Sequence, residues 1–465
     1  MSEHRGHQQH EVEVRSDVVD VISNLPDCIL DHILSFMPTK EVVKTSILST
    51  RWKNLWASAP NIDFDDERLR GKEVDALRLL DVTSFVNFVE RVLRLRDASN
   101  MEKFRLSCHV FRDAFKIRSW ISHAIMQNVQ ELDLFLFAED PSVIPQSMFN
   151  STSLVSLKIR MDCVIEFPSD VSFPCLKTLH LSFVRFPNDD FTEKLFSGCR
   201  VLEELVLFRI CLRNLKNIAI SNSTLKRLTI CDQSSFVVVN DPTSGCKIKI
   251  DAANLTYFEY IGFLSNKIIL NNTSSLEKSF IEFLNPRGRG NELEVAGRAI
   301  DLLKRLKHVV SLRLSDYYII ETLSFVASVC SVVFPNLTHL MMTMEIENDT
   351  FTELMRLLSF CPVLQSICFS EGFKCFMHLG ENHYIWYSKP ICIENCLKTV
   401  SLKNFHGYKS EICFLKCVLK TACALERMDI RWSETYLRDL KRKTKARKEL
   451  EKIERSSTAF VIKFS

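Results

Sequence analysis

The chain has 465 residues, of which 46% are hydrophobic and 25% charged, with only 11 glycines. This length exceeds what one compact core accommodates, and the hydrophobic content excludes an intrinsically disordered protein. The 60 basic residues against 57 acidic ones give a net charge of +3, without the basic excess of a dedicated nucleic-acid-binding protein.

The first 20 residues are polar and lack an apolar core, so we expect no signal peptide. The longest apolar stretch, near 323–334, is interrupted by serines and too short to cross a bilayer. We therefore expect a cytoplasmic and/or nuclear protein with no membrane partner, whose 17 cysteines are reduced. His4, His7 and His10 are candidate metal ligands, but we expect residues 1–17 to form a disordered tail.

Residues 18–66 predict three short helices. After Pro26, helical spacing of apolar residues runs to Pro38, which ends the first helix. Thr39 is positioned to cap a second helix that ends near Leu48. Ser49 is positioned to cap a third helix, which carries Trp52, Leu55 and Trp56 on one face. A bundle this small cannot bury so many large apolar side chains internally, so its surplus apolar face predicts a partner.

The order Leu25-Pro26-Asp27, Ile29-Leu30, Ile33-Leu34-Ser35-Phe36, Pro38-Thr39-Lys40, Arg51-Trp52 and Leu55-Trp56 resembles an F-box of the plant type. The resemblance implies docking on the Skp adaptor of a cullin–RING ubiquitin ligase. It assigns the docking face to Leu25, Pro26, Ile29, Leu30, Ile33 and Leu34, with Trp52, Leu55 and Trp56 shared between core and contact. The alternative is a helical cap that seals the end of a repeat stack.

An acidic stretch, residues 61–67, follows this bundle directly. Clustered carboxylates are candidate ligands for a divalent metal. We expect instead a solvated linker, and therefore no metal and no cofactor.

The phrase Leu-x-x-Leu-x-Leu, with conservative replacements, then recurs at intervals of about 22 to 33 residues. The copies begin at Leu154, Leu176, Leu202, Leu225, Leu337, Leu364, Leu397 and Leu425, with looser ones at Val129, Leu255 and Val309. Each copy predicts a short strand, and stacked strands predict a curved parallel sheet with helices such as 190–197, 291–306 and 350–360 on its convex side. We expect the ladder to break near 261–283.

The fold predicted for residues 100–385 is an irregular α/β solenoid of leucine-rich repeats, the kind that follows the F-box in many plant proteins. Side chains between the apolar positions alternate toward the concave face. The candidate substrate-binding residues there are Lys158, Arg160, His180, Phe208, Arg313, His339 and Met341. Isolated charges with aromatic and Met anchors favour a protein or peptide partner, and the alternative is a solvated strand surface.

Residues 386–465 resemble the FBD domain found at the end of many plant F-box/leucine-rich-repeat proteins. The pattern predicts a helix over 411–423, a basic helix and a closing strand near 460–464. The spacing of four cysteines is compatible with a tetrahedral zinc site: Cys392, Cys396, Cys413 and Cys417. The apolar residues next to them in the sequence favour buried, reduced thiols instead. The basic run 441–448 is a candidate import signal or RNA contact, or a solvated helix face paired with Glu449 and Glu451. Arg287-Gly-Arg-Gly290 is too short to predict RNA binding.

No nucleophile with its base, paired carboxylates, P-loop or zinc-protease helix occurs at usable spacing. We therefore expect a non-catalytic substrate-recognition subunit of an SCF ubiquitin ligase, which binds the Skp adaptor and an unknown protein target, with no nucleic-acid partner. The alternatives are a repeat scaffold without a ligase role and, third, a receptor for a small ligand.

Overall fold

The computed structural model describes residues 22, 24–66, 76–97, 101–109, 114–137, 141–165, 168, 170–212, 214–233, 245–284, 292–315, 333–344, 348–373, 390–436, 439–453, 456–457 and 460–465. The chain divides into two compact units, Met1–Arg105 and Leu106–Ser465. The predicted tail (1–17) and Arg287-Gly-Arg-Gly290 lie outside the described residues.

The first unit contains the predicted helical bundle. Its elements are α1 (Asp27–Leu34), α2 (Thr39–Lys44), the 3-10 turn η1 (Thr45–Ile47), α3 (Leu55–Ser58), β1 (Asn61–Asp65), α4 (Ala76–Leu95) and the start of β2 (Lys103–His109). Pro26 and Pro38 each stand directly before a helix, where a missing N–H breaks no intrahelical bond. The bundle core consists of Leu30, Leu34, Val42, Trp52 and Ala59.

Two predicted helix caps are wrong. Thr39 is the first residue of α2, and its Oγ1 accepts a hydrogen bond from the backbone N–H of Asp63 at 2.7 Å. Ser49 caps no helix, because turns continue to Asn54 and α3 begins only at Leu55. At Thr39, the hydrogen bond from Asp63 of β1 occupies the hydroxyl that a cap would use.

The acidic stretch is a strand rather than a linker. In β1, Ile62 and Phe64 are buried, while Asp63 and Asp65 project from the other side. The Arg105 guanidinium binds both carboxylates, Nη1 to Asp63 Oδ1 at 2.8 Å and Nη2 to Asp65 Oδ2 at 3.1 Å. These carboxylates are therefore engaged by a cation of the protein itself.

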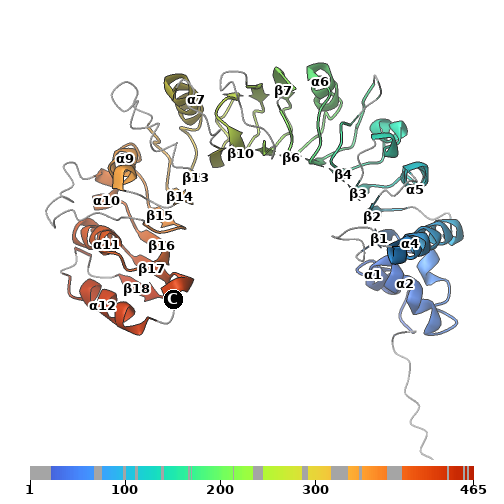
Figure 1. Cartoon of the computed structure of the whole chain (residues 1–465), viewed down its shortest axis with the longest axis horizontal. Coiled ribbons are helices and arrows are strands. Elements are labelled where there is room, and N and C mark those ends of the chain that lie inside the picture. The colour runs from blue at the N-terminus through green and yellow to red at the C-terminus, as the bar shows by residue number, and fades with distance from the viewer. Residues whose placement is uncertain are drawn as a thin grey trace, which may run out of the picture. The chain divides into compact units, whose positions relative to one another are not determined.

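The second unit is built around a curved sheet of parallel strands, with helices on its convex side (Figure 1). From β3 onward the strands follow in the order β3 (Glu131–Phe137), β4 (Ser156–Arg160), β5 (Thr178–Ser182), β6 (Glu204–Phe208), β8 (Arg227–Cys231), β10 (Tyr257–Phe263), β12 (Lys278–Leu284), β13 (Ser311–Leu314), β14 (His339–Met342), β15 (Ser366–Phe369), β16 (Thr399–Phe405), β17 (Arg427–Trp432) and β18 (Val461–Phe464). Each predicted repeat contributes one of these strands, which confirms the solenoid.

Burial alternates along the strands as predicted. In β4, Leu157 and Ile159 are buried while Lys158 and Arg160 are exposed on the other side. The register brings equivalent positions of neighbouring strands side by side, so outward side chains form rows across the sheet.

The predicted convex helices are confirmed as α6 (Asp189–Ser197), α7 (Glu292–Arg305) and α9 (Asn348–Ser359). Asn188 caps α6 by accepting a hydrogen bond from the backbone N–H of Phe191. The remaining helical elements are α5 (Ala114–Met126), η3 (Pro141–Val143), η4 (Gln146–Asn150), α10 (Ile391–Asn395), α11 (Lys409–Thr421), η5 (Glu434–Tyr436) and α12 (Leu440–Glu451).

A second, smaller sheet replaces helices between several repeats. It consists of β7 (Asn217–Ser221), β9 (Lys247–Asp251) and β11 (Lys267–Asn271), all parallel, and Figure 1 shows β7 on the outer side beside α6. The predicted break near 261–283 is wrong, because β10 pairs with β12 in regular register while β11 joins the outer sheet. In β7, β9 and β11, which lie between these repeats, buried and more exposed side chains alternate as in other strands. The spacing between repeats therefore differs here, although the inner sheet continues.

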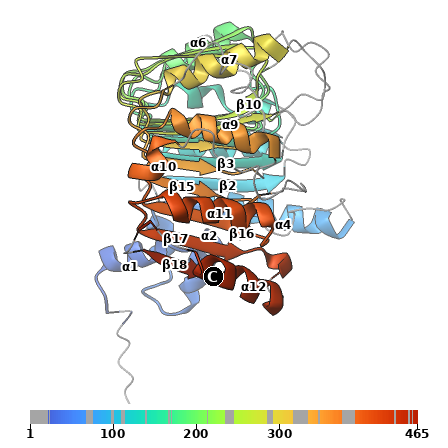
Figure 2. The ribbon, with the colours of Figure 1, turned by 90° about the vertical axis from the view of Figure 1, so that its left-hand side faces the viewer.

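The C-terminal elements follow the predicted order. Strands β16, β17 and β18 succeed one another at the end of the sheet, with α11 and α12 alongside (Figure 2). The ion pair from Lys416 Nζ to Glu449 Oε2, at 3.2 Å, joins α11 to α12. The basic helix and closing strand therefore cap the repeat stack.

Leu207→Ala is expected to destabilise the second unit. Leu207 is fully buried in β6, and removing a buried leucine side chain costs about 3 kcal/mol through lost burial and a residual cavity. Lys158→Ala in β4 is the control, because its side chain is exposed. Urea unfolding of both variants measures the difference, and equal loss of stability in both would contradict the assigned burial.

Candidate protein-binding surfaces

An exposed apolar surface covers the helical bundle of the first unit. Ile29 and Ile33, one turn apart on α1, are 44% and 39% exposed. Phe36, Ile47 and Leu48 are 76%, 86% and 64% exposed. We call these five residues the bundle surface. The bundle already has a closed core, so these side chains are not needed to fold it, and exposed apolar groups of this size mark a contact site.

The predicted docking residues divide into two groups. Pro26, Ile29 and Ile33 are exposed, as a docking face requires. Leu30 and Leu34 are 0% and 1% exposed, so the expectation that they line that face does not fit the structure. Positions 30 and 34 form the stripe of α1 next to that of 29 and 33, about one residue's rotation around the helix, and this stripe faces the bundle core.

The residues expected to be shared between core and contact also differ. Trp52 is buried, while Leu55, Trp56 and Leu25 are partly buried against the core. The sequence pattern assigned no docking role to Phe36, Ile47 or Leu48. All three are exposed: Phe36 follows the end of α1, Ile47 ends η1 and Leu48 comes directly after it.

The structure places the candidate substrate-binding residues in three outward rows on the concave face. In the first row, His339 lies between Ser311 and Ser366. In the second, Lys158 lies beside His180, and Arg313 beside Met341. In the third, Arg160 and Phe208 flank Ser182. Lys158, Arg160, His180 and Phe208 are therefore close together, whereas Arg313, His339 and Met341 form a separate group further along the sheet.

In the first two rows, several charged side chains already contact polar or charged side chains of the same chain. His180 Nε2 lies 3.5 Å from Glu204 Oε1, and Arg227 Nε lies 3.7 Å from the same oxygen. Burial lowers the pKa of His180 below its usual value despite Glu204, so the imidazole is neutral near pH 7. Glu259 accepts a hydrogen bond from Tyr257, and burial with this carboxylate raises the pKa of Tyr257 to about 12.

Arginines on the concave face stack on aromatic rings of the neighbouring strands. The Cζ atoms of Arg160, Arg227 and Arg313 lie 4.8, 4.8 and 4.2 Å from the ring centroids of Phe135, Tyr257 and Phe280. Sequence reasoning missed these three aromatic partners. Aligning the repeats in register would have identified these pairs, because each arginine lies directly opposite its aromatic ring in the adjacent strand.

Of the four C-terminal cysteines, Cys392 is buried and Cys396, Cys413 and Cys417 are half-buried. Cys392 is buried and its thiol donates to the carbonyl of Leu358 at 3.3 Å. Burial raises the pKa of Cys392 to about 12, which keeps it protonated and a poor metal ligand. Among the described residues, no group of three or more His, Cys, Asp or Glu side chains is placed to bind a metal ion. The candidate ligands His4, His7 and His10 lie outside that set.

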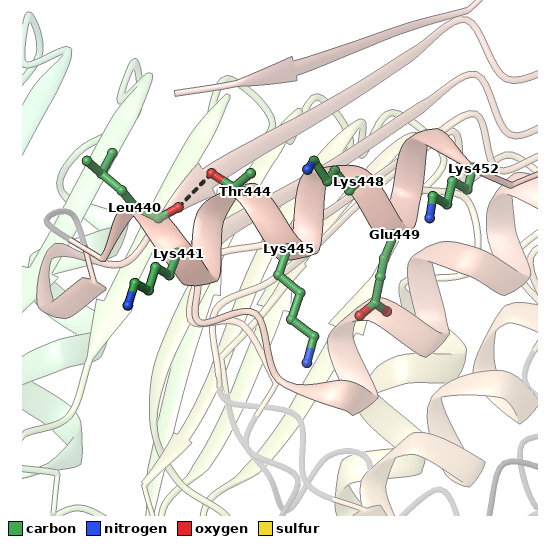
Figure 3. A pocket seen from close by; sticks show the side chains of 7 residues that line it. All are labelled: Leu440, Lys441, Thr444, Lys445, Lys448, Glu449 and Lys452. Carbon is green, nitrogen blue, oxygen red and sulfur yellow. Dashed lines mark hydrogen bonds between the residues drawn. The ribbon is translucent and has the colours of Figure 1, made fainter.

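The basic run forms helix α12, whose faces differ. Lys443 and Arg447 lie over the rings of Trp432 and Phe464, at 5.4 and 4.7 Å. Figure 3 shows Lys441, Lys445, Lys448 and Lys452 along the other face, where Thr444 donates a hydrogen bond to the carbonyl of Leu440. Lys443 and Arg447 therefore pack on aromatic rings, whereas Lys441, Lys445 and Lys448 lie exposed on a helix face. The import signal and the RNA contact stay predictions.

Within the described part of the chain, no helix combines the length and apolar character needed to cross a bilayer.

Known families match three parts of the chain. The F-box domain matches residues 22–63, the LRR repeats of FBD-associated F-box protein At5g56370 match residues 117–277, and the FBD matches residues 388–430. The bundle surface therefore lies within the F-box, and strands β4 to β10 within the matched repeats.

Three relatives from Arabidopsis thaliana align over most of the chain. F-box/LRR-repeat protein At4g14096 is 32% identical over 90% of this chain and 90% of its own length. Putative F-box/FBD/LRR-repeat protein At3g59240 is 36% identical over 89% of this chain and 84% of its own length. F-box/LRR-repeat protein At3g59210 is 34% identical over 91% of this chain and 90% of its own length. With its F-box, parallel leucine-rich-repeat sheet and C-terminal FBD, this chain belongs to the plant F-box/FBD/LRR-repeat family.

Proposed function

We propose that this chain is the non-catalytic substrate-recognition subunit of an SCF (Skp–cullin–F-box) E3 ubiquitin ligase. The bundle surface binds the Skp adaptor and so recruits the cullin–RING ligase. The observation that carries the proposal is the set of large apolar side chains exposed on a bundle with a complete core of its own. Full burial of an exposed isoleucine or phenylalanine contributes about 1.5–3 kcal/mol, and each of these side chains contributes in proportion to the part of it that is exposed.

The concave face of the repeats binds the protein target. Rows of outward side chains from successive parallel strands present polar, charged and aromatic groups over a continuous surface. Holding a target there raises its effective concentration near the ubiquitin-charged enzyme, a task that needs no catalytic residue of this chain. The complex works in the cytoplasm, the nucleus or both.

Co-purification from plant cells separates this role from that of a repeat scaffold without a ligase function. A tagged full-length chain is expected to recover the Skp adaptor together with cullin. Recovery of protein partners without adaptor or cullin, from a chain shown to be folded, would favour the scaffold instead.

A further inference from the structure

A group of aromatic and arginine side chains lies at the carboxyl ends of strands β3 to β6, in two clusters separated by Ser182. Its members, which we call the Phe–Arg band, are Phe135, Phe137, Arg160, Phe183, Phe208 and Arg209. The Arg160 guanidinium lies 4.8 Å from the Phe135 ring centroid, and the Phe135 and Phe137 centroids are 4.5 Å apart. The Phe183 ring meets Phe208 edge-on at 6.4 Å, and Arg209 lies 5.0 Å over Phe183.

The backbone is strained where the band meets the loops. Phe183 and Arg209, each directly after a strand, have φ angles of +63° and +52°. This left-handed conformation disfavours bulky side chains, and glycine adopts it at little cost. The two residues occupy the same register position, one after the paired Ser182 and Phe208. Two neighbouring strands thus hold large side chains in a strained conformation that brings them against one surface, as binding sites do.

The band is cationic and aromatic, with little acidic charge of its own. The row of paired strand positions that contains Arg160 has no carboxylate among these five residues: Phe135, Arg160, Ser182, Phe208 and Cys231. Nearby Glu204 is already close to His180 and Arg227, and Asp133 is opposite Lys158 in the next row. Among the described residues, no carboxylate lies within ion-pairing distance of Arg160 or Arg209.

A stacked guanidinium fits a carboxylate. The ring covers one face of the planar group, while its N–H donors remain free at the edge to bind both oxygens of an acid. Arg160 is exposed, and Lys158 from the same strand adds a second positive charge. Phe208, 38% exposed, offers an apolar surface two strands away, across the short side chain of Ser182.

We propose that the Phe–Arg band binds a target segment in the polyproline II conformation that carries an acidic residue and an aromatic or large aliphatic residue three positions apart. Adjacent strands are about 4.8 Å apart, so Arg160 and Phe208 are separated by about 10 Å. Three residues of a polyproline II segment rise about 9.3 Å and complete one turn, so side chains three positions apart face the same side. The acidic side chain binds Arg160 and the apolar one packs on Phe208 and Phe183. This inference rests on the proposed role of the chain as a target receptor.

Selection from a random library of 12-residue peptides, against the full-length chain bound to a Skp adaptor, tests the band. The wild-type chain is expected to enrich Asp or Glu three positions from Phe, Tyr, Trp or Leu. Arg160→Glu should replace that acid by Lys or Arg, and Phe208→Ala should weaken selected peptides at least tenfold. Arg313→Glu is the matched control, because Arg313 also stacks on a ring but lies far along the face.

Failure of the band and failure of the receptor role give different results. If the selected peptides lack the acidic–apolar pair, if none is enriched, or if Arg160→Glu selects the same peptides as wild type, the band is not the binding site. An equal change in Arg313→Glu overturns it as well. Adaptor binding, measured on the same samples, reports separately on the ligase role, because the bundle surface shares no residue with the band. Circular dichroism and cooperative unfolding report on the folding of each variant.

Discussion

Ile29→Asp combined with Ile33→Asp is expected to weaken binding of a Skp adaptor at least 100-fold. Both side chains are substantially exposed on one side of α1, so neither contributes to the bundle core. Burial of the exposed parts of these two isoleucines, 44% and 39% of their surfaces, stabilises a complex by about 1–2.5 kcal/mol in total, and two carboxylates in their place must be desolvated without a partner. The measurement is a calorimetric titration of purified chain with adaptor.

Leu440→Asp provides the control for this double variant. Leu440 is 74% exposed on α12, in the second unit, and the change likewise replaces an exposed aliphatic side chain by a carboxylate. The control should bind adaptor as tightly as the wild-type chain. An unchanged affinity in the double variant, with normal circular dichroism, would remove the bundle surface from the interface.

At pH 4.5, Glu411→Ala is expected to destabilise the C-terminal repeats by about 3 kcal/mol. The Glu411 carboxylate is fully buried and accepts hydrogen bonds from the backbone N–H groups of His406 and Tyr408, at 2.8–3.2 Å. Its removal leaves these buried donors without an acceptor, each at a cost of about 1–3 kcal/mol. Solenoid stability is local, so hydrogen exchange of the β16 and β17 amides is the measurement.

The same carboxylate makes stability depend on pH. Burial raises the pKa of Glu411 to about 7, against the lowering effect of its backbone N–H donors, while the unfolded chain titrates near 4.5. The folded state therefore binds the proton more tightly, and the stabilisation is complete below pH 4.5 and is lost as pH rises through 7. His406 Nδ1 lies 3.9 Å from Glu411 Oε1. The difference between wild type and Glu411→Ala should therefore shrink between pH 4.5 and pH 7; a difference that grows over this range would contradict the raised pKa.

The repeats could be predicted from the sequence because each carries its own local signal. A buried triplet such as Leu176, Leu179 and Leu181 fixes the strand, and parallel stacking fixes its register. The segments between repeats were harder. Ile218 and Ile220, or Ile248 and Ile250, are too few apolar residues to separate a short strand from a loop, so the outer sheet was missed.

The bundle surface was predicted only in part, for a different reason. Helical spacing identifies two apolar stripes on α1 but does not state which is the core. Leu30 and Leu34 are inside because they face Val42 and Trp52, contacts that depend on how three helices pack. The family resemblance named both stripes as docking residues, and only packing separates Ile29 and Ile33 from them. Similarly, Arg51 binds the carbonyl of Leu25 and the carboxylate of Asp27, a long-range role that no local pattern shows.

Direct binding of the purified full-length chain to a purified Skp adaptor tests the central claim. A one-to-one complex with a dissociation constant of about 1 μM or tighter, abolished by Ile29→Asp with Ile33→Asp and retained by Leu440→Asp, is the predicted result. No binding by a chain whose circular dichroism and cooperative unfolding show it to be folded would contradict the receptor role. The helical bundle would then act as a cap on the repeats of an interaction scaffold.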